Sequence, residues 1–98
     1  MGRFAATICT EPEDIGRLEQ LVSALPAEAR VRIVLREGDT IEGTVVERPA
    51  LQLFEDADGT QGMNAMLRLD VPSLPPPSTT YVWLSEVRGV EPLDTPAA

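Results

Sequence analysis

The residues that could do chemistry in this chain are carboxylates and arginines, because the sequence contains no histidine. Without histidine, the Ser-His and Cys-His arrangements of nucleophilic catalysis cannot form, and the commonest metal ligand is missing. Asp and Glu are numerous, but no spacing marks two of them as an acid–base pair. The sequence therefore predicts a protein that is not an enzyme and that carries no cofactor.

One acidic stretch superficially resembles a calcium-binding loop. Asp56, Asp58 and Thr60 would supply oxygen ligands at alternate positions. Such a loop needs a closing glutamate at its twelfth position, where Met66 or Leu67 stands here. We therefore expect a turn at the tip of a hairpin and no metal site.

The basic residues are eight arginines, with no lysine, against sixteen acidic residues, for a net charge of −8. An acidic chain repels polyanions at long range, so we expect no binding to duplex DNA. A local arginine cluster can still bind an anion, because the guanidinium is a planar fork that fits phosphate. Arg30, Arg32 and Arg36 share one alternation face, which we interpret as a solvated strand face.

These side chains must be positioned by a β-rich domain whose centre is the segment 31–46. Val31, Ile33 and Leu35 alternate with more polar residues, which is typical of a half-buried strand. Gly38 lies in a turn, where glycine adopts a positive φ without strain. Gly43 lies inside the next strand, where glycine indicates a bulge or a sharp bend.

A helix is expected before this strand pair, over residues 11–25. Thr10 and Glu13 have the spacing of a capping box, and Pro26 ends the helix. A stripe of apolar residues at helical spacing predicts a lid on the core: Ile15, Leu18, Leu21, Val22 and Leu25.

More strands follow, over residues 51–54, 63–71, 80–87 and 90–93, with a proline-rich connector at 72–78. The sum predicts a mainly β (α+β) fold. It consists of an N-terminal helix followed by a strongly bent, five- to six-stranded antiparallel barrel of the SH3-like or Sm-like type. We expect a single domain over 1–98, with the barrel at 30–93 and a flexible tail at 94–98.

The strand pair resembles the first Sm motif, which has a hydrophobic strand, a turn glycine and a second glycine five residues later. These positions are Val31, Ile33, Leu35, Gly38 and Gly43. A helix before the motif is also a feature of Sm-like proteins. Near the end of the chain, Val87, Arg88 and Gly89 resemble the second Sm motif. The chain is therefore similar to the Sm-like (LSm/Hfq-type) superfamily, and it most resembles a small, uncharacterised bacterial family with a variant Sm-like fold.

The resemblance leaves two alignments open after Gly43. In Sm proteins an Asp and an Asn follow this glycine, and the Asn helps to hold an RNA base. Without a gap, Pro49 and Leu53 occupy these places and can do neither task, although Leu51–Phe54 makes a natural third strand.

If residues 48–62 are instead an insertion, Asn64 takes the asparagine position, with Thr60 in place of the aspartate. This second alignment is the only one that keeps an RNA pocket. The candidate RNA-binding residues that it implies are Asn64, Arg88 and Gly89.

The resemblance implies a non-enzymatic Sm-like protein that is a candidate for weak binding of single-stranded RNA and for self-association through edge strands as a homo-oligomer. The alternative is a protein-interaction or self-assembly module that has kept the fold and lost RNA. No apolar run approaches the ~20 residues of a membrane span, and the first residues lack a secretory signal. We therefore expect a cytoplasmic protein with no membrane contact.

Overall fold

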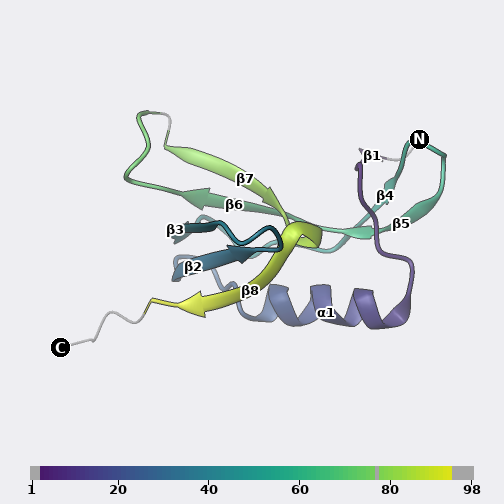
Figure 1. The fold of residues 1–98 in the computed structure, drawn as a ribbon, viewed down its shortest axis with the longest axis horizontal. Coiled ribbons are helices and arrows are strands. Elements are labelled where there is room, and N and C mark those ends of the chain that lie inside the picture. The colour runs from purple at the N-terminus through teal and green to yellow at the C-terminus, as the bar shows by residue number, and fades with distance from the viewer. Residues whose placement is uncertain (1–2, 77, 94–98) are drawn as a thin grey trace.

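The computed structural model describes residues 3–76 and 78–93, so the predicted tail at 94–98 lies outside the described residues. The described chain forms one α-helix, a short 3₁₀ turn and eight strands (Figure 1). In chain order the elements are β1 (Arg3–Phe4), α1 (Pro12–Ser23), β2 (Arg30–Leu35), β3 (Thr40–Val45), β4 (Gln52–Glu55), β5 (Gln61–Asn64), β6 (Met66–Asp70), β7 (Thr79–Trp83), η1 (Leu84–Glu86) and β8 (Val87–Pro92).

The strands form two separate sheets. The larger has the order β7-β6-β3-β2-β8, and the smaller has the order β1-β4-β5. The prediction of a mainly β fold with one helix is confirmed. Barrel closure is not found in the described chain, because β7 and β8 end the larger sheet and do not pair with each other. The predicted count of five to six strands was also too low. All pairs are antiparallel except that of β1 with β4, which is parallel.

Helix α1 is shorter than the predicted span 11–25, and its N-terminus differs. Glu11 is the N-cap and makes no side-chain capping hydrogen bond, so the predicted capping box is wrong. Because Pro12 is already the first helical residue, Thr10 lies outside the cap position. The lid itself is confirmed, because Leu18 and Leu21 are buried in the core.

The turn between β2 and β3 is as predicted. Gly38 has φ of 105°, a conformation that costs other residues about 1 kcal/mol or more. The Gly38 amide donates to the Leu35 carbonyl at 2.9 Å, and the Leu35 amide donates to the Asp39 carbonyl at 2.8 Å. The turn fixes the register in which Ile33 lies opposite Ile41.

Gly43 is special for a different reason from the one predicted. Its pairing with Val31 is regular, with no bulge in the β2–β3 ladder. A Cβ atom at this position would lie 2.7 Å from the Asp70 carbonyl oxygen. Glycine is therefore required so that β6 can approach β3, to which it pairs through Thr44–Asp70 and Val45–Leu69.

The predicted strand at 63–71 is two strands in two different sheets. β5 pairs with β4 in the smaller sheet, and β6 pairs with β7 and β3 in the larger. The change occurs at Ala65, whose carbonyl accepts a hydrogen bond from the Leu84 amide at 2.9 Å. In the view of Figure 1, the β6–β7 and β4–β5 hairpins extend in opposite directions from this point, and α1 runs below them.

A single cluster of buried apolar side chains joins the helix to the larger sheet. Its fully buried members include Leu25, Ile33, Leu67, Leu69 and Leu84. Each such side chain stabilises the fold by about 1.5–3 kcal/mol relative to an exposed one. No helix in the described residues is long and apolar enough to cross a membrane.

Candidate functional site

Asn64, the first residue predicted to bind RNA, is completely buried at the point where the chain passes between the two sheets. Its Nδ2 donates to the Thr7 carbonyl at 2.7 Å and to the Ser85 Oγ at 3.0 Å. Its Oδ1 accepts from the Ala65 amide at 2.8 Å and from the Ser85 amide at 3.2 Å. An amide side chain has two N–H donors and two acceptor lone pairs, so all of them are used inside the chain.

Arg88 and Gly89 lie on β8 and are not among the hydrogen-bond partners of Asn64. Gly89 pairs with Val34, but Val87 pairs with Leu35, so Arg88 is the extra residue of a β-bulge. A bulge re-aims the side chain that it carries, and Arg88 is exposed to solvent. RNA binding by Asn64, Arg88 and Gly89 stays a prediction, and for Asn64 it would require the loss of internal hydrogen bonds.

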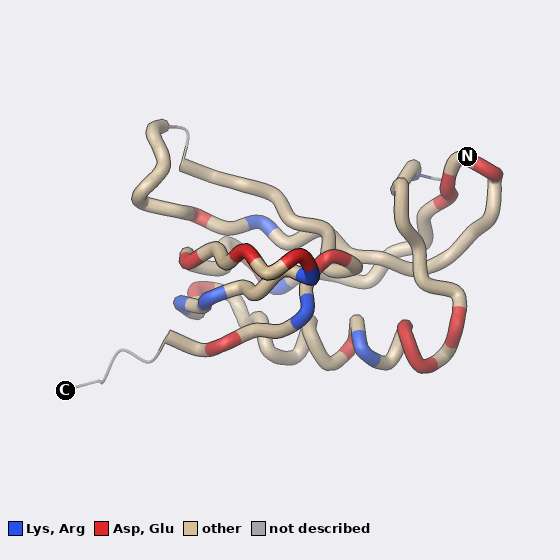
Figure 2. The backbone as a smooth tube through the Cα atoms, viewed as in Figure 1, with Lys and Arg blue, Asp and Glu red and all other residues tan. Residues whose placement is uncertain are grey.

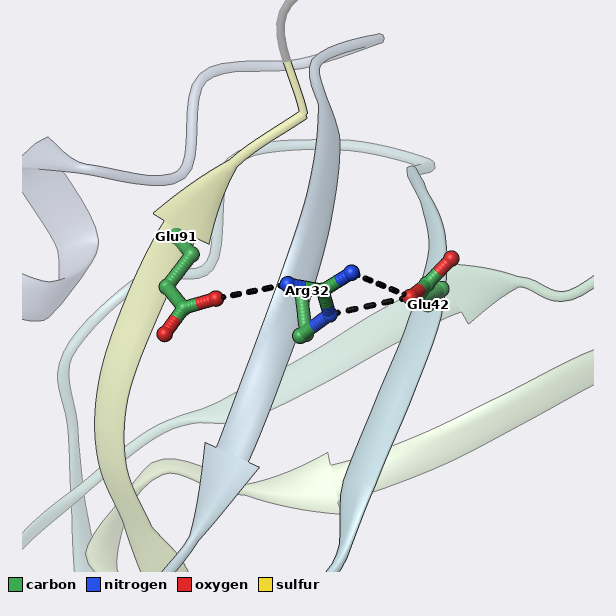
Figure 3. Close-up of polar contacts among 3 residues, drawn as sticks. All are labelled: Arg32, Glu42 and Glu91. Carbon is green, nitrogen blue, oxygen red and sulfur yellow. Dashed lines mark hydrogen bonds and ion pairs between the residues drawn. The ribbon is translucent and has the colours of Figure 1, made fainter.

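Arg32, on the face that we expected to be solvated, is held between two carboxylates on neighbouring strands (Figure 3). Its guanidinium lies 2.7 Å from Glu42 and 2.9 Å from Glu91. Hydrogen bonding to Glu42, and to a smaller extent to Glu91, raises the pKa of Arg32 above its ordinary value. Two carboxylates within the sheet thus balance the charge of this arginine, which makes it a weaker candidate for binding an anion than an arginine without an ion pair.

A hollow of about 410 Å³ lies at the junction of the two sheets. Its walls come from β1, β4, β6, β7 and the connector that follows β3. We call it the arginine–aromatic cavity, after the residues Arg3, Arg48, Arg68, Phe54, Tyr81 and Trp83 that line it. The set contains three of the eight arginines and three of the four aromatic residues of the chain.

The three arginines of this cavity reach it from different elements. Arg3 is on β1, Arg48 is on the connector, and Arg68 is on β6. Within residues 3–76 and 78–93, none of the three forms an ion pair. Glu47 is the one acidic residue in the lining. Figure 2 shows acidic positions grouped at the start of α1 and at the β4–β5 tip, whereas β7 carries no charge.

The aromatic residues form a braced wall. Phe54 and Trp83 contact each other edge to face, with ring centroids 5.1 Å apart and planes at 86°. Such pairs contribute about 0.5–1.5 kcal/mol beyond their buried area. Phe54 is only 6% exposed, whereas Tyr81 is 60% exposed, so Tyr81 offers its ring to solvent.

A second hollow, of about 460 Å³, lies between α1, the segment before it and η1. It is lined by Cys9 and by both charge signs, with Arg17 and Arg36 against Asp14 and Glu86. Burial, followed by the charge of Asp14, raises the pKa of the Cys9 thiol, although Arg36 and Arg17 oppose the shift. The thiol is therefore protonated at neutral pH and is a poor nucleophile.

The sequence interpretation missed the arginine–aromatic cavity. Alternation within each strand puts Met66 and Arg68 on one face of β6, and Tyr81 and Trp83 on one face of β7. The register then sets Arg68 opposite Tyr81 and Met66 opposite Trp83. Alternation alone would have found the β6 pair and the β7 pair. Which residues of the two strands lie opposite each other, however, depends on the long connector after β6.

Comparison with known proteins gave one family and one solved structure. The model of a family described as Domain of unknown function (DUF3247) matches residues 2–93. The chain is also similar to a crystal structure, that of XC5848 from Xanthomonas campestris, described as adopting a novel variant of the Sm-like motif. The two are 34% identical with a TM-score of 0.86, over 96% of this chain and 100% of that chain. No curated protein matches the chain.

Proposed function

The chain belongs to the DUF3247 family and has a variant Sm-like fold, and from this premise we propose that it is a non-enzymatic protein that binds single-stranded RNA. The resemblance to Sm-like proteins noted in the sequence is confirmed by the similarity to XC5848. RNA binding is what that resemblance implies. The proposal needs a surface on this chain that suits RNA.

The observation that carries the proposal is the arginine–aromatic cavity. Proteins that bind single-stranded nucleic acid combine cations that follow the backbone with aromatic rings on which bases stack. The cavity gathers Arg3, Arg48 and Arg68 around an exposed Tyr81. In a chain of net charge −8, this grouping makes a local surface with the required chemistry.

The same charge predicts that binding is weak. Long-range repulsion between the acidic chain and a polyanion lowers affinity and slows association, most strongly at low salt. Contacts between arginine and phosphate act in the opposite direction and are lost as salt is raised. We expect the phosphate contacts to dominate, so that RNA binds at low salt and dissociates as salt increases.

The test is fluorescence anisotropy of labelled oligo(A) and oligo(U) RNA titrated with the protein over a range of salt concentrations. With three arginine–phosphate contacts, log K should fall against log[salt] with a slope of about −2, since each contact on a single strand contributes about −0.7. If anisotropy does not change for either RNA at the lowest salt, the RNA-binding proposal is wrong.

The residues implied by the family motif are tested in the same assay. Arg88→Ala removes the exposed cation of the β8 bulge and leaves the buried core untouched. If RNA lies against Arg88 and Gly89, affinity falls and the salt slope becomes shallower by about 0.7. An unchanged affinity removes these two residues from the site.

The alternative function is a self-assembly module, and one observation favours it. The larger sheet has β7 and β8 as its two outer strands, and open strands can pair with strands of another copy. A sizing column with light scattering measures the mass directly. A stable ring or dimer together with absent RNA binding would favour this alternative.

A further inference from the structure

We propose that the arginine–aromatic cavity holds one nucleotide of the RNA between the two sheets, with its base on Tyr81 and its phosphates on Arg68 and Arg3. Arg3 thereby makes the N-terminal strand β1 a clamp over the bound strand. The inference rests on the proposed function and adds which residue holds the base, which residues hold the phosphates, and how the cavity closes. It also places the RNA away from the motif residues Asn64, Arg88 and Gly89.

The outer face of the β6–β7 hairpin supplies the platform. Arg68 and Tyr81 are directly opposed across the hairpin, so a cation and a flat ring lie side by side. Trp83 lies two pairs further along on the same face, opposite Met66, and is braced by Phe54. A ring that is already exposed on a paired strand loses little conformational freedom when a base stacks on it.

The smaller sheet supplies the clamp. Arg3 lies opposite Phe54 in the parallel pairing of β1 with β4. β1 has only two residues, and the next backbone contact is the Ala5 amide donating to the Glu55 carbonyl at 3.1 Å. Such a short β-strand opens at low free-energy cost, whereas a nucleotide with one phosphate on Arg3 and the other on Arg68 would join the two sheets.

The size and charge of the cavity fit one nucleotide better than a long strand. Its volume of about 410 Å³ lies in the range of sites for small organic ligands, about 300–1,000 Å³. Glu47 is the one acidic residue in its lining, against three arginines that form no ion pair in the described chain. The positive charge is therefore available to an anion.

Tyr81→Ala and Tyr81→Phe form the first test, with labelled oligo(A) RNA as the probe. Loss of one stacked base should weaken binding by about 5- to 150-fold, because such stacking contributes about 1–3 kcal/mol. Tyr81→Phe retains the ring and should bind within about twofold of the original protein. Trp83 is the single tryptophan, so quenching of its emission reports on a base that enters this cavity.

The second test uses trypsin, which cleaves after arginine. Cleavage between Arg3 and Phe4 should be slowed severalfold by saturating oligo(A), because β1 no longer separates from β4 when RNA is bound. Arg3→Gln should make the salt dependence of RNA affinity shallower by about 0.7 in slope. Arg30→Gln, which changes an exposed arginine outside the cavity, should leave that slope unchanged.

The outcomes separate the site from the function. If the original protein binds no RNA, the proposed function fails. If it binds RNA but Tyr81→Ala binds equally well and Trp83 emission is unchanged, the function stands and this site is overturned. If Tyr81→Ala weakens binding but RNA does not slow cleavage after Arg3, the clamp is overturned.

Discussion

Two of the regions in which polar side chains gather differ in how their polar groups are satisfied. Around Asn64 and Ser85, side-chain and backbone groups bond to one another inside the chain. In the arginine–aromatic cavity, Arg3, Arg48 and Arg68 have no carboxylate partner among the described residues. The polar groups of the first region are therefore satisfied within the chain, whereas the three arginines of the second have no ion-pair partner among the described residues.

The difference teaches that a match to a family motif and an available binding surface are separate properties. Asn64 stands in the position that one alignment gives to an RNA-binding asparagine, yet it links β5, η1 and the N-terminal segment. A buried group that loses its partner costs about 1–3 kcal/mol, whereas an exposed cation can exchange water for a phosphate at little cost. Substitutions in the two regions should therefore have opposite consequences for stability and for binding.

Asn64→Asp should have the largest effect on stability. The change turns a donor into a carboxylate that faces the Thr7 carbonyl, and a buried unpaired charge costs about 3–5 kcal/mol. Because burial raises the pKa of such a carboxyl, the loss of stability relative to the original protein should be smallest below pH of about 4 and should grow as pH rises. Urea unfolding at several pH values measures this dependence. Gln52→Glu, the same chemical change in the cavity lining, is the control and should shift stability by less than about 0.5 kcal/mol.

Ser85→Ala should have an intermediate effect. It removes the hydroxyl that accepts from Asn64 Nδ2 but keeps the Ser85 amide that donates to Asn64 Oδ1. One unsatisfied donor then costs about 1–2 kcal/mol. Urea unfolding measures the loss, with Ser78→Ala on an exposed hydroxyl as the control. Equal midpoints for the two variants would contradict the role that we give to this network.

Arg32→Gln should have a smaller effect, and salt should reduce it further. The change leaves Glu42 and Glu91 on neighbouring strands without their shared cation. Exposed ion pairs are screened by salt, so the difference in melting temperature should shrink at high ionic strength. A difference that grows with salt would show that the pair does not act through charge.

Arg68→Gln should have the smallest effect on stability and should separate the two regions most clearly. The guanidinium makes no ion pair in the described structure, so unfolding should shift by less than about 0.5 kcal/mol. RNA affinity should nevertheless fall, with a salt slope shallower by about 0.7. Urea unfolding tests the expected stability, and RNA anisotropy tests the expected loss of affinity. A clear loss of stability would mean that Arg68 belongs to the structure and not to a site.

Local features of the fold were predictable from the sequence because they depend on neighbouring residues. The turn at Gly38 and the apolar face of α1 follow from conformational freedom and periodicity, and both are present. The capping box failed because Thr10 and Glu13 have the correct spacing, but the helix begins one residue later than that spacing requires. Short-range patterns do not fix the exact end of a helix.

Long-range features were not predictable, because they depend on which strands meet. The segment 63–71 alternates without interruption, yet it divides at Ala65 between two sheets. Gly43 was recognised as special, but the close Asp70 carbonyl is visible only once β6 lies beside β3. The cavity was missed for the same reason, since Arg3, Arg48, Arg68 and Tyr81 are distant in sequence.

The bulge on β8 has a consequence for how copies of this chain could stack. An incoming strand needs an even row of donors and acceptors, but the row on β8 is interrupted at Arg88 and ends at Pro92, whose nitrogen has no hydrogen to give. Only a short stretch of the free edge of β8 can therefore form a regular hydrogen-bonded ladder with another strand. The geometry thus disfavours unlimited fibre growth from β8. The free edge of β7 is the more regular one for pairing with a strand of another copy.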